Sequence, residues 1–271
     1  MKTTQRLLVV FAAALVLLSG TGCNKLKARD HLNKGVQAYK NSKFEQAIDH
    51  FQQAVALDPS LINARLYLAT AFAQQYIPGA DTPENNHYGE QAVDQYKQVL
   101  QVDPKNINSI KGIAYLYLQM KRFPLAKEFY KKASESDPND PEPYYSVAVI
   151  DWTQTYVPRQ EERAKLGMKP DESLPAKDKK VCAEMKEKNT ANVQEGIDNL
   201  NKALQLRPDY DDAMAYMNLM YRERADIQCD DPAARAADLK AADEWVDKTM
   251  ATKKAKAEKQ PAGGIVMDQK Q

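Results

Sequence analysis

The sequence has little of what catalysis and metal binding usually require. Its three cysteines form no CxxC pair and its three histidines no HxxxH pair. No Walker loop, GxSxG or GxGxxG motif occurs. His31 and His50 have polar neighbours in helical segments, which predicts solvated helix faces for both. We therefore expect no enzyme, no cofactor, no metal and no small-molecule substrate.

An excess of charge of one sign is also lacking. Lys and Arg number 38 against 37 Asp and Glu, for a formal net charge of +1. Nucleic-acid-binding proteins usually carry a basic excess, so no nucleic-acid partner is expected. Glycine is scarce, at 10 residues, whereas Ala, Gln, Lys, Leu and Glu are frequent. This composition is typical of an all-α protein.

The longest hydrophobic run, Leu7 to Leu18, lies near the N-terminus between a basic start and the small residues of "SGTGC". This order of charged, apolar and small segments is typical of an export signal. As a helix the run would span about 18 Å, well short of a roughly 30 Å hydrocarbon core. We predict a signal peptide over residues 1–22, and a membrane-spanning anchor is the alternative.

A cysteine follows this segment directly. Cys23 with Gly22 before it resembles the lipobox of bacterial lipoproteins, although Gly20 stands where the lipobox usually has leucine. The resemblance implies acylation, including palmitate, at Cys23 and a lipidated linker over residues 23–27. By the same resemblance Asn24 favours the outer membrane, with the chain facing the periplasm. Several acyl chains would anchor it stably.

A repeated pattern runs through the rest of the chain. It begins with "GVQAYKNSKFEQAIDHFQQAVALDP", in which small residues stand where helices would approach, aromatics lie between them and a proline ends the second helix. The key positions are Gly35, Tyr39, Phe44, Ala47, Phe51, Ala54 and Pro59. The order recurs in register up to Pro104, Pro138 and Pro208, and it opens once more after that. This resembles the tetratricopeptide repeat, a helix pair of about 34 residues.

The resemblance implies an all-α, right-handed solenoid of about five helix pairs over residues 28–255. Units two, four and five are longer than the repeat and span residues 62–106, 141–210 and 211–255. Helix-start signals lie in their extra segments at Thr82-Pro83, Leu174-Pro175 and Asp231-Pro232. We expect these extras to extend the second helices, with a short separate helix over Arg159–Leu166. Residues 256–271 lose aromatics and read as a disordered tail.

In this family the first helices line a concave groove that partners commonly occupy. Mapped onto this chain, the groove residues are Asn33, Tyr39, Lys40, Tyr67, Lys111, Tyr115, Tyr145, Trp152 and Tyr216. Tyrosine and tryptophan are favoured contact residues because they are rigid, large and amphipathic. The alternative is that these rings pack against neighbouring units.

The resemblance thus implies a non-catalytic lipoprotein that binds or scaffolds envelope proteins or peptides. An envelope enzyme or metal-dependent factor, with its site in the insertion over residues 153–193, is the alternative. A zinc site of Cys182, Cys229 and His87 would offer only three ligands from distant segments.

The two remaining cysteines are an even number in a chain expected in an oxidising compartment. Cys182 precedes Gly196 by almost as many residues as Cys229 precedes Ala241, and these two small residues are equivalent positions in adjacent units. Adjacent repeats place equivalent positions side by side. We predict a Cys182–Cys229 disulfide, and two unrelated free thiols are the alternative.

Overall fold

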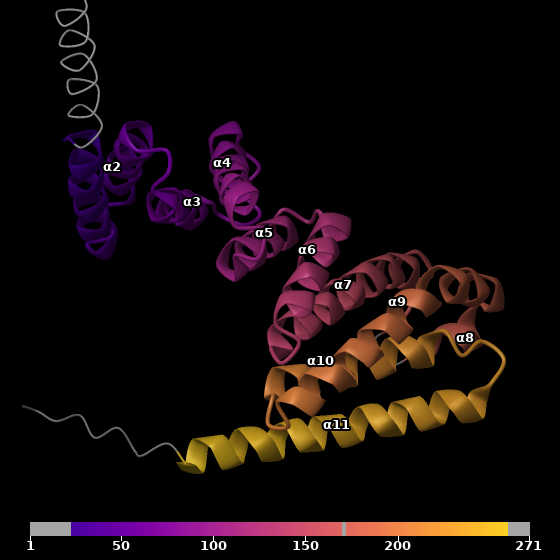
Figure 1. Cartoon of the computed structure of the whole chain (residues 1–271). Coiled ribbons are helices and arrows are strands. Elements are labelled where there is room, and N and C mark those ends of the chain that lie inside the picture. The colour runs from indigo at the N-terminus through magenta and orange to yellow at the C-terminus, as the bar shows by residue number, and fades with distance from the viewer. Residues whose placement is uncertain (1–22, 170–171, 260–271) are drawn as a thin grey trace, which may run out of the picture. The chain divides into compact units, whose positions relative to one another are not determined.

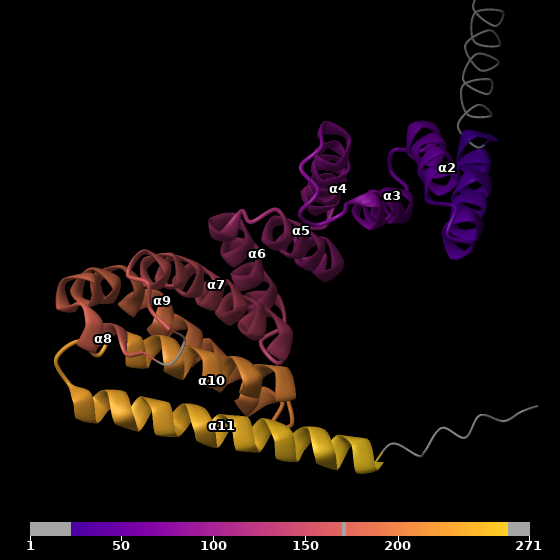
Figure 2. The ribbon, with the colours of Figure 1, turned by 180° about the vertical axis from the view of Figure 1, so that it is seen from behind.

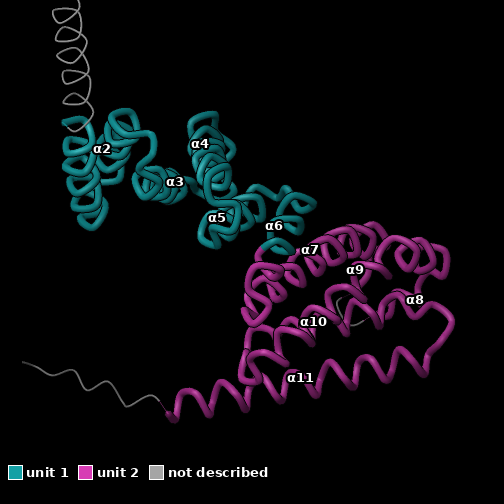
Figure 3. Tube along the Cα trace, viewed as in Figure 1, with its two compact units in different colours: residues 1–132 teal, residues 133–271 magenta. Residues whose placement is uncertain are grey.

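The computed structural model describes residues 23–169 and 172–259, and within them it contains helices and no strand (Figure 1). The predictions for residues 1–22 and for 260–271 lie outside this part. The chain divides into an N-terminal unit, residues 1–132, and a C-terminal unit, residues 133–271 (Figure 3). The predicted all-α fold is confirmed. None of the described helices is both long and apolar enough to cross a bilayer.

The N-terminal unit begins with a helix over residues 23–40. It continues with α2 (Phe44–Leu57), α3 (Ile62–Gln75), α4 (Pro83–Val102) and α5 (Ile107–Gln119). Helix α6 (Phe123–Ser136) crosses the boundary between the units. Successive helices pack on one another, α2 on α3, α3 on α4 and α4 on α5.

The C-terminal unit holds α7 (Pro141–Lys165), α8 (Leu174–Lys177), α9 (Lys179–Leu206), α10 (Asp211–Asp226) and α11 (Pro232–Lys259). Figure 2 shows the same helices from behind, with α10 between α9 and α11 in both views. Helix α7 packs on α9 and on α10, and α10 packs on α11.

Side-chain caps explain where the long second helices begin. The Thr82 hydroxyl accepts a hydrogen bond from the Asn85 N–H, at 3.2 Å, directly before the proline that opens α4. Asp231 accepts one from the Ala234 N–H at 2.8 Å, before the proline that opens α11. Such caps satisfy N–H groups that have no partner inside the helix. The signal at Leu174 opens only the short α8, and Asp178 caps α9.

Small residues let the paired helices approach closely. Gly35 packs against the fully buried Phe51, and a methyl group at Gly35 would lie 2.5 Å from that ring. In the C-terminal unit Gly196 takes a similar position against Met220. Burying a side chain such as Phe51 contributes about 1.5–3 kcal/mol. The repeat pattern therefore marks the contacts that hold each helix pair together.

Three predicted boundaries were wrong. Residues 23–27 are not a separate linker, because helix-forming residues continue the first helix back to Cys23 and Ala28 is fully buried. Helix α11 continues past residue 255 to Lys259 through an Ala- and Lys-rich sequence of strong helix formers. No separate helix spans Arg159–Leu166, since α7 runs through Pro158 to Lys165. Buried contacts beyond that proline hold the helix in place.

Candidate functional site

Five aromatic side chains lie in a row along α7 and α10. Tyr145, Trp152 and Tyr156 are two turns and then one turn apart on α7, so they share one face of the helix. The ring centroids follow one another at 5.0 Å from Tyr210 to Tyr145, 5.5 Å to Tyr216, 5.5 Å to Trp152 and 4.6 Å to Tyr156. We call these five residues the aromatic row. The structure thus brings together three of the predicted groove residues, Tyr145, Trp152 and Tyr216.

The aromatic row is partly packed against the core of its unit. Tyr210 is buried, and its hydroxyl donates a hydrogen bond to the Glu142 carboxylate at 3.0 Å. Burial raises the pKa of Tyr145, Tyr210 and Tyr216, so these phenols stay neutral hydrogen-bond donors at physiological pH. The other four rings are half-buried, and Tyr145, Trp152 and Tyr216 pack against the core of the unit, which is what the packing alternative expects.

The row ends at the wall of a cavity, where Tyr156 is one of the lining residues. The cavity has a volume of about 600 Å³, within the range of ligand pockets. It is lined by Tyr156, Arg159, Gln160, Arg163, Ala164, Met168, Glu172, Arg222, Asp226, Arg235 and Leu239. Arginines outnumber acidic residues in this wall by four to two. The Arg235 Nε is buried and meets no acceptor among the residues that the structure describes.

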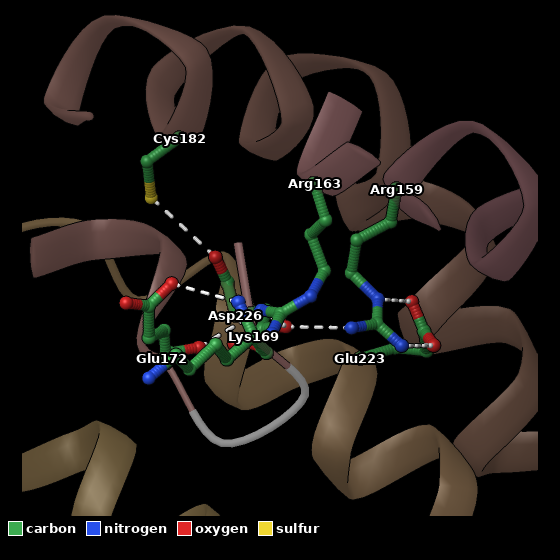
Figure 4. A network of polar contacts seen from close by, with 7 residues as sticks. All are labelled: Arg159, Arg163, Lys169, Glu172, Cys182, Glu223 and Asp226. Atoms are coloured by element: carbon green, nitrogen blue, oxygen red, sulfur yellow. Dashed lines mark hydrogen bonds and ion pairs between the residues drawn. The ribbon is translucent and has the colours of Figure 1, made fainter. Parts of the chain in front are cut away.

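A buried ion cluster forms the floor of this region (Figure 4). Arg159 donates two parallel hydrogen bonds to Glu223, at 2.8 and 2.7 Å, and a third to Asp226 at 2.8 Å. Burial raises the pKa of Glu223, although Arg159 opposes it. For Arg159 burial works in the opposite direction, but both carboxylates outweigh it and raise its pKa. The charges therefore satisfy one another and fix α7 to α10.

Arg163 holds the loop that follows α7. It donates to the carbonyl oxygens of Lys169, at 2.5 Å, and Glu172, at 2.9 Å (Figure 4). These bonds satisfy the two carbonyl groups and connect Lys169 and Glu172 to α7.

The structure joins Cys182 and Cys229 in a disulfide with a Cα–Cα distance of 5.7 Å, the pair that the sequence predicts. Figure 4 shows the Cys182 sulfur pointing toward Asp226, whose carbonyl oxygen is 3.5 Å away. The bond therefore lies beside the ion cluster and connects α9 to the segment after α10. Bonded sulfurs are not thiolate ligands, so the alternative zinc site with His87 is wrong. Within the described residues no three His, Cys, Asp or Glu side chains gather as metal ligands would.

The other predicted groove residues lie in the N-terminal unit. Tyr67 and Tyr115 are 42% and 52% exposed. Tyr67 stacks on Phe51 with ring centroids 5.6 Å apart. Tyr39 meets Phe44 edge-on at 5.3 Å. The polar members are Asn33 and Lys40, which are exposed, and Lys111, which is half-buried.

Sequence reasoning missed Tyr156, Tyr210 and three of the four cavity arginines, Arg159, Arg163 and Arg235. A usable signal was present, because Arg159 and Arg163 are one turn apart, as are Glu223 and Asp226. Acids and bases on matching faces of two helices favour pairing. Nothing in one sequence, however, indicated that α7 and α10 would meet there.

Comparisons with known proteins identify the class. Two family models, both described as tetratricopeptide repeat, match residues 28–61 and 89–150. The chain therefore contains tetratricopeptide repeats. The class that the fold defines is the tetratricopeptide-repeat solenoid. No curated protein sequence matches the chain.

Solved structures share the fold at low sequence identity. A crystal structure of MamA protein is 11% identical with a TM-score of 0.58, over 87% of this chain and 97% of that one. MamA from Desulfovibrio magneticus RS-1 is 15% identical with a TM-score of 0.56, over 84% and 96%. YrrB, described as a TPR protein with an unusual peptide-binding site, is 13% identical with a TM-score of 0.51, over 84% and 90%. The likeness shows that the described residues form a solenoid of this type.

Proposed function

We propose that this chain is a non-catalytic scaffold, anchored by lipid at Cys23, that binds envelope proteins or peptides through its C-terminal unit. The aromatic row, continuous with an arginine-rich cavity, is the observation that carries this proposal. Rigid aromatic rings supply contact area at low entropic cost, and arginine supplies directed hydrogen bonds. Both residue types dominate binding energy at protein interfaces. The anchor places the scaffold at the outer membrane, facing the periplasm.

The chemistry of the site indicates the chemistry of the partner. Three of the four arginines in the cavity wall already have partners, Arg159 and Arg163 in the ion cluster and Arg222 with Asp243 at 2.8 Å. The buried Arg235 Nε, in contrast, is a donor without an acceptor in the described residues. A partner segment with a carboxylate or carbonyl oxygen would satisfy that donor. Apolar or aromatic side chains next to it would cover the aromatic row. We expect such a mixed apolar and acidic segment in the partner.

The insertion over residues 153–193 supports a structural role better than a catalytic one. Its buried charges, Arg159 and Arg163, are bonded to carboxylates and loop carbonyls. Its cysteine, Cys182, is in the disulfide. A catalytic group must be able to react with substrate, whereas these groups bind the insertion to its own unit. No specific observation favours the enzyme alternative.

The binding site is tested by removing two cavity arginines that lie outside the ion cluster. In cells carrying Arg222→Ala with Arg235→Ala, crosslinking and mass spectrometry should recover much less partner than in wild type. Contact arginines at hot spots contribute about 2 kcal/mol or more each. Arg122→Ala, in the exposed ion pair of the N-terminal unit, is the matched control and should recover the wild-type set. Equal recovery by the double variant would place the contact elsewhere.

The anchor is tested separately. Cys23→Ser should release the chain from the membrane fraction, because the acyl chains that hold it would be lost. Mass spectrometry of the wild-type protein should show an acylated Cys23. A soluble wild-type protein without acyl groups would contradict the lipoprotein part of the proposal and leave the binding part standing.

A further inference from the structure

Two of the three histidines of the chain meet in the first repeat, contrary to the separate solvated faces that the sequence predicts. His31 lies on the helix over residues 23–40 and His50 on α2. Their Nδ1 atoms are 3.3 Å apart and their ring centroids 5.5 Å apart. Both side chains are half-buried. Within the described part of the chain, neither imidazole has another hydrogen-bond partner.

The distance between the two nitrogens matches the edge of a metal coordination tetrahedron. Two imidazole nitrogens, each about 2.0–2.1 Å from a tetrahedral zinc ion, are about 3.3–3.4 Å apart. Two ligands at right angles around an ion of similar size would be closer, at about 2.8–3.0 Å. The observed 3.3 Å therefore fits tetrahedral geometry better than square-planar geometry.

From this geometry we infer that His31 and His50 form a two-histidine site for a divalent transition-metal ion, with zinc as the best fit. Each Nδ1 would donate its lone pair to the ion, and the hydrogen that otherwise lies between the two Nδ1 atoms would move by way of solvent to the Nε2 of its own ring, so that both imidazoles stay neutral. The two other coordination positions are open to water or to ligands from another molecule. Nothing in the proposed partner binding requires this site, which lies in the other unit.

The surroundings suit a partly exposed, exchangeable site. Asp30 lies close enough to both imidazoles to interact with them electrostatically, and its carboxylate is paired with Lys34 at 2.7 Å. A surface depression of about 410 Å³ reaches His50, and its lining includes the amide side chains of Asn33 and Gln46 and two lysines, Lys34 and Lys43. An ion there would remain accessible from solvent.

The test is zinc titration of the full chain, purified without a histidine tag and monitored by competition with a chromophoric zinc indicator. We expect saturable zinc binding by wild type. His31→Ala and His50→Ala should each lose it. His87→Ala, which removes the third histidine, is the matched control and should bind as wild type does.

Circular dichroism checks that each variant is folded, and substitution by Gln at the same positions gives a second, bulkier set. Loss of binding in folded variants at both positions supports the site. Equal zinc binding by wild type and by the His31→Ala and His50→Ala double variant would overturn it. So would a wild-type protein that shows no saturable binding.

Discussion

The two units differ in the length of their helices and in the burial of their ion pairs. Helices α2 to α5 of the N-terminal unit are 13 to 20 residues long, whereas α7, α9 and α11 of the C-terminal unit have 25, 28 and 28. The Arg122–Glu90 pair of the N-terminal unit has side chains 45% and 49% exposed. The Arg159–Glu223 pair of the C-terminal unit is only 11% and 2% exposed. The C-terminal unit thus has a buried ion pair in addition to exposed ones such as Lys179–Asp230, whose side chains are 81% and 84% exposed.

The difference follows from helix length. A repeat of ordinary length can be held by small residues against aromatic ones, as Gly35 is against Phe51. In the C-terminal unit the comparable contact is made by Gly196, which meets Asp151 on α7. The second half of α7 extends beyond Asp151 and offers Arg159 and Arg163 to its neighbours instead of apolar side chains. An ion cluster and a disulfide fix it there. The same extension creates the cavity, so the reinforcement and the candidate site arise together.

The largest expected effect is on the buried ion cluster. Arg159→Met should destabilise the C-terminal unit by about 3–5 kcal/mol, because it leaves Glu223 buried without its paired cation, while Asp226 keeps only Arg163, 3.6 Å away. The matched Arg122→Met in the N-terminal unit should cost at most about 1 kcal/mol, since its pair is exposed. Urea unfolding followed by hydrogen exchange of each unit would measure both. Similar losses for the two variants would remove the contrast.

The same variant makes a pH prediction. Burial already raises the pKa of Glu223, and loss of Arg159 removes the opposing influence. A carboxyl whose pKa is raised in the folded state favours folding below its ordinary pKa of about 4.3, and this contribution is lost as the pH rises through the raised value. The penalty of Arg159→Met should therefore be smaller near pH 4 than at pH 8. An unchanged penalty would show that Glu223 does not control it.

Removal of the disulfide should cause the next largest loss of stability. Replacing Cys182 and Cys229 with Ser should cost about 2–4 kcal/mol, since chain entropy gives about 4 kcal/mol for a separation of 47 residues. Hydrogen exchange should rise in the C-terminal unit and stay unchanged in the N-terminal unit. Reducing agent should have the same effect on wild type and none on the double variant. A wild-type protein with two labelled thiols before reduction would contradict the bond.

Substituting Ala for one glycine in each unit should have smaller effects on stability. A methyl group at Gly35 would meet the stiff Phe51 ring, whereas at Gly196 it would first meet the flexible end of Met220. Overpacking costs about 1–3 kcal/mol, and Ala in place of Gly in a helix recovers up to about 1 kcal/mol. Gly35→Ala should therefore lower stability by about 1 kcal/mol or more, and Gly196→Ala should be nearly neutral. Thermal unfolding of the two variants would show whether this order holds.

The smallest effect should come from the contact between Lys256 and Asp211, which are 2.5 Å apart. The hydrogen bond from Lys256 lowers the pKa of Asp211 below its ordinary value. The resulting stability is present above about pH 4 and is lost as the pH falls through the lowered value. Asp211→Asn should thus lower the melting temperature slightly at pH 7 and not at pH 2. The neighbouring Asp212→Asn serves as the control.

The sequence was most informative about repeats and caps. The order of small residues, aromatics and prolines predicted the helix pairs, and Thr82-Pro83 and Asp231-Pro232 marked helix starts, because these signals act within one helix pair. The disulfide pair also followed from equivalent positions in adjacent units. These inferences need only local geometry and the repeat itself.

The site was only partly predictable. The concave positions of the repeat led to Tyr145, Trp152 and Tyr216, yet not to Tyr210, which stands just before its helix. Arg159 follows Pro158, and the sequence analysis predicted that it opens a short separate helix. Its burial depends on carboxylates from α10, a tertiary contact that no local pattern specifies. The meeting of His31 and His50 was missed for the same reason.

The most direct test of the account is site-specific photo-crosslinking from the cavity in living cells. A photoreactive residue in place of Gln160, in the cavity wall, should capture a specific partner through contact with its side chain. The same residue in place of Glu187, exposed on α9 and outside that wall, should capture little. If Glu187 captures the partner as efficiently as Gln160, or if neither position captures any protein, the cavity is not the binding site.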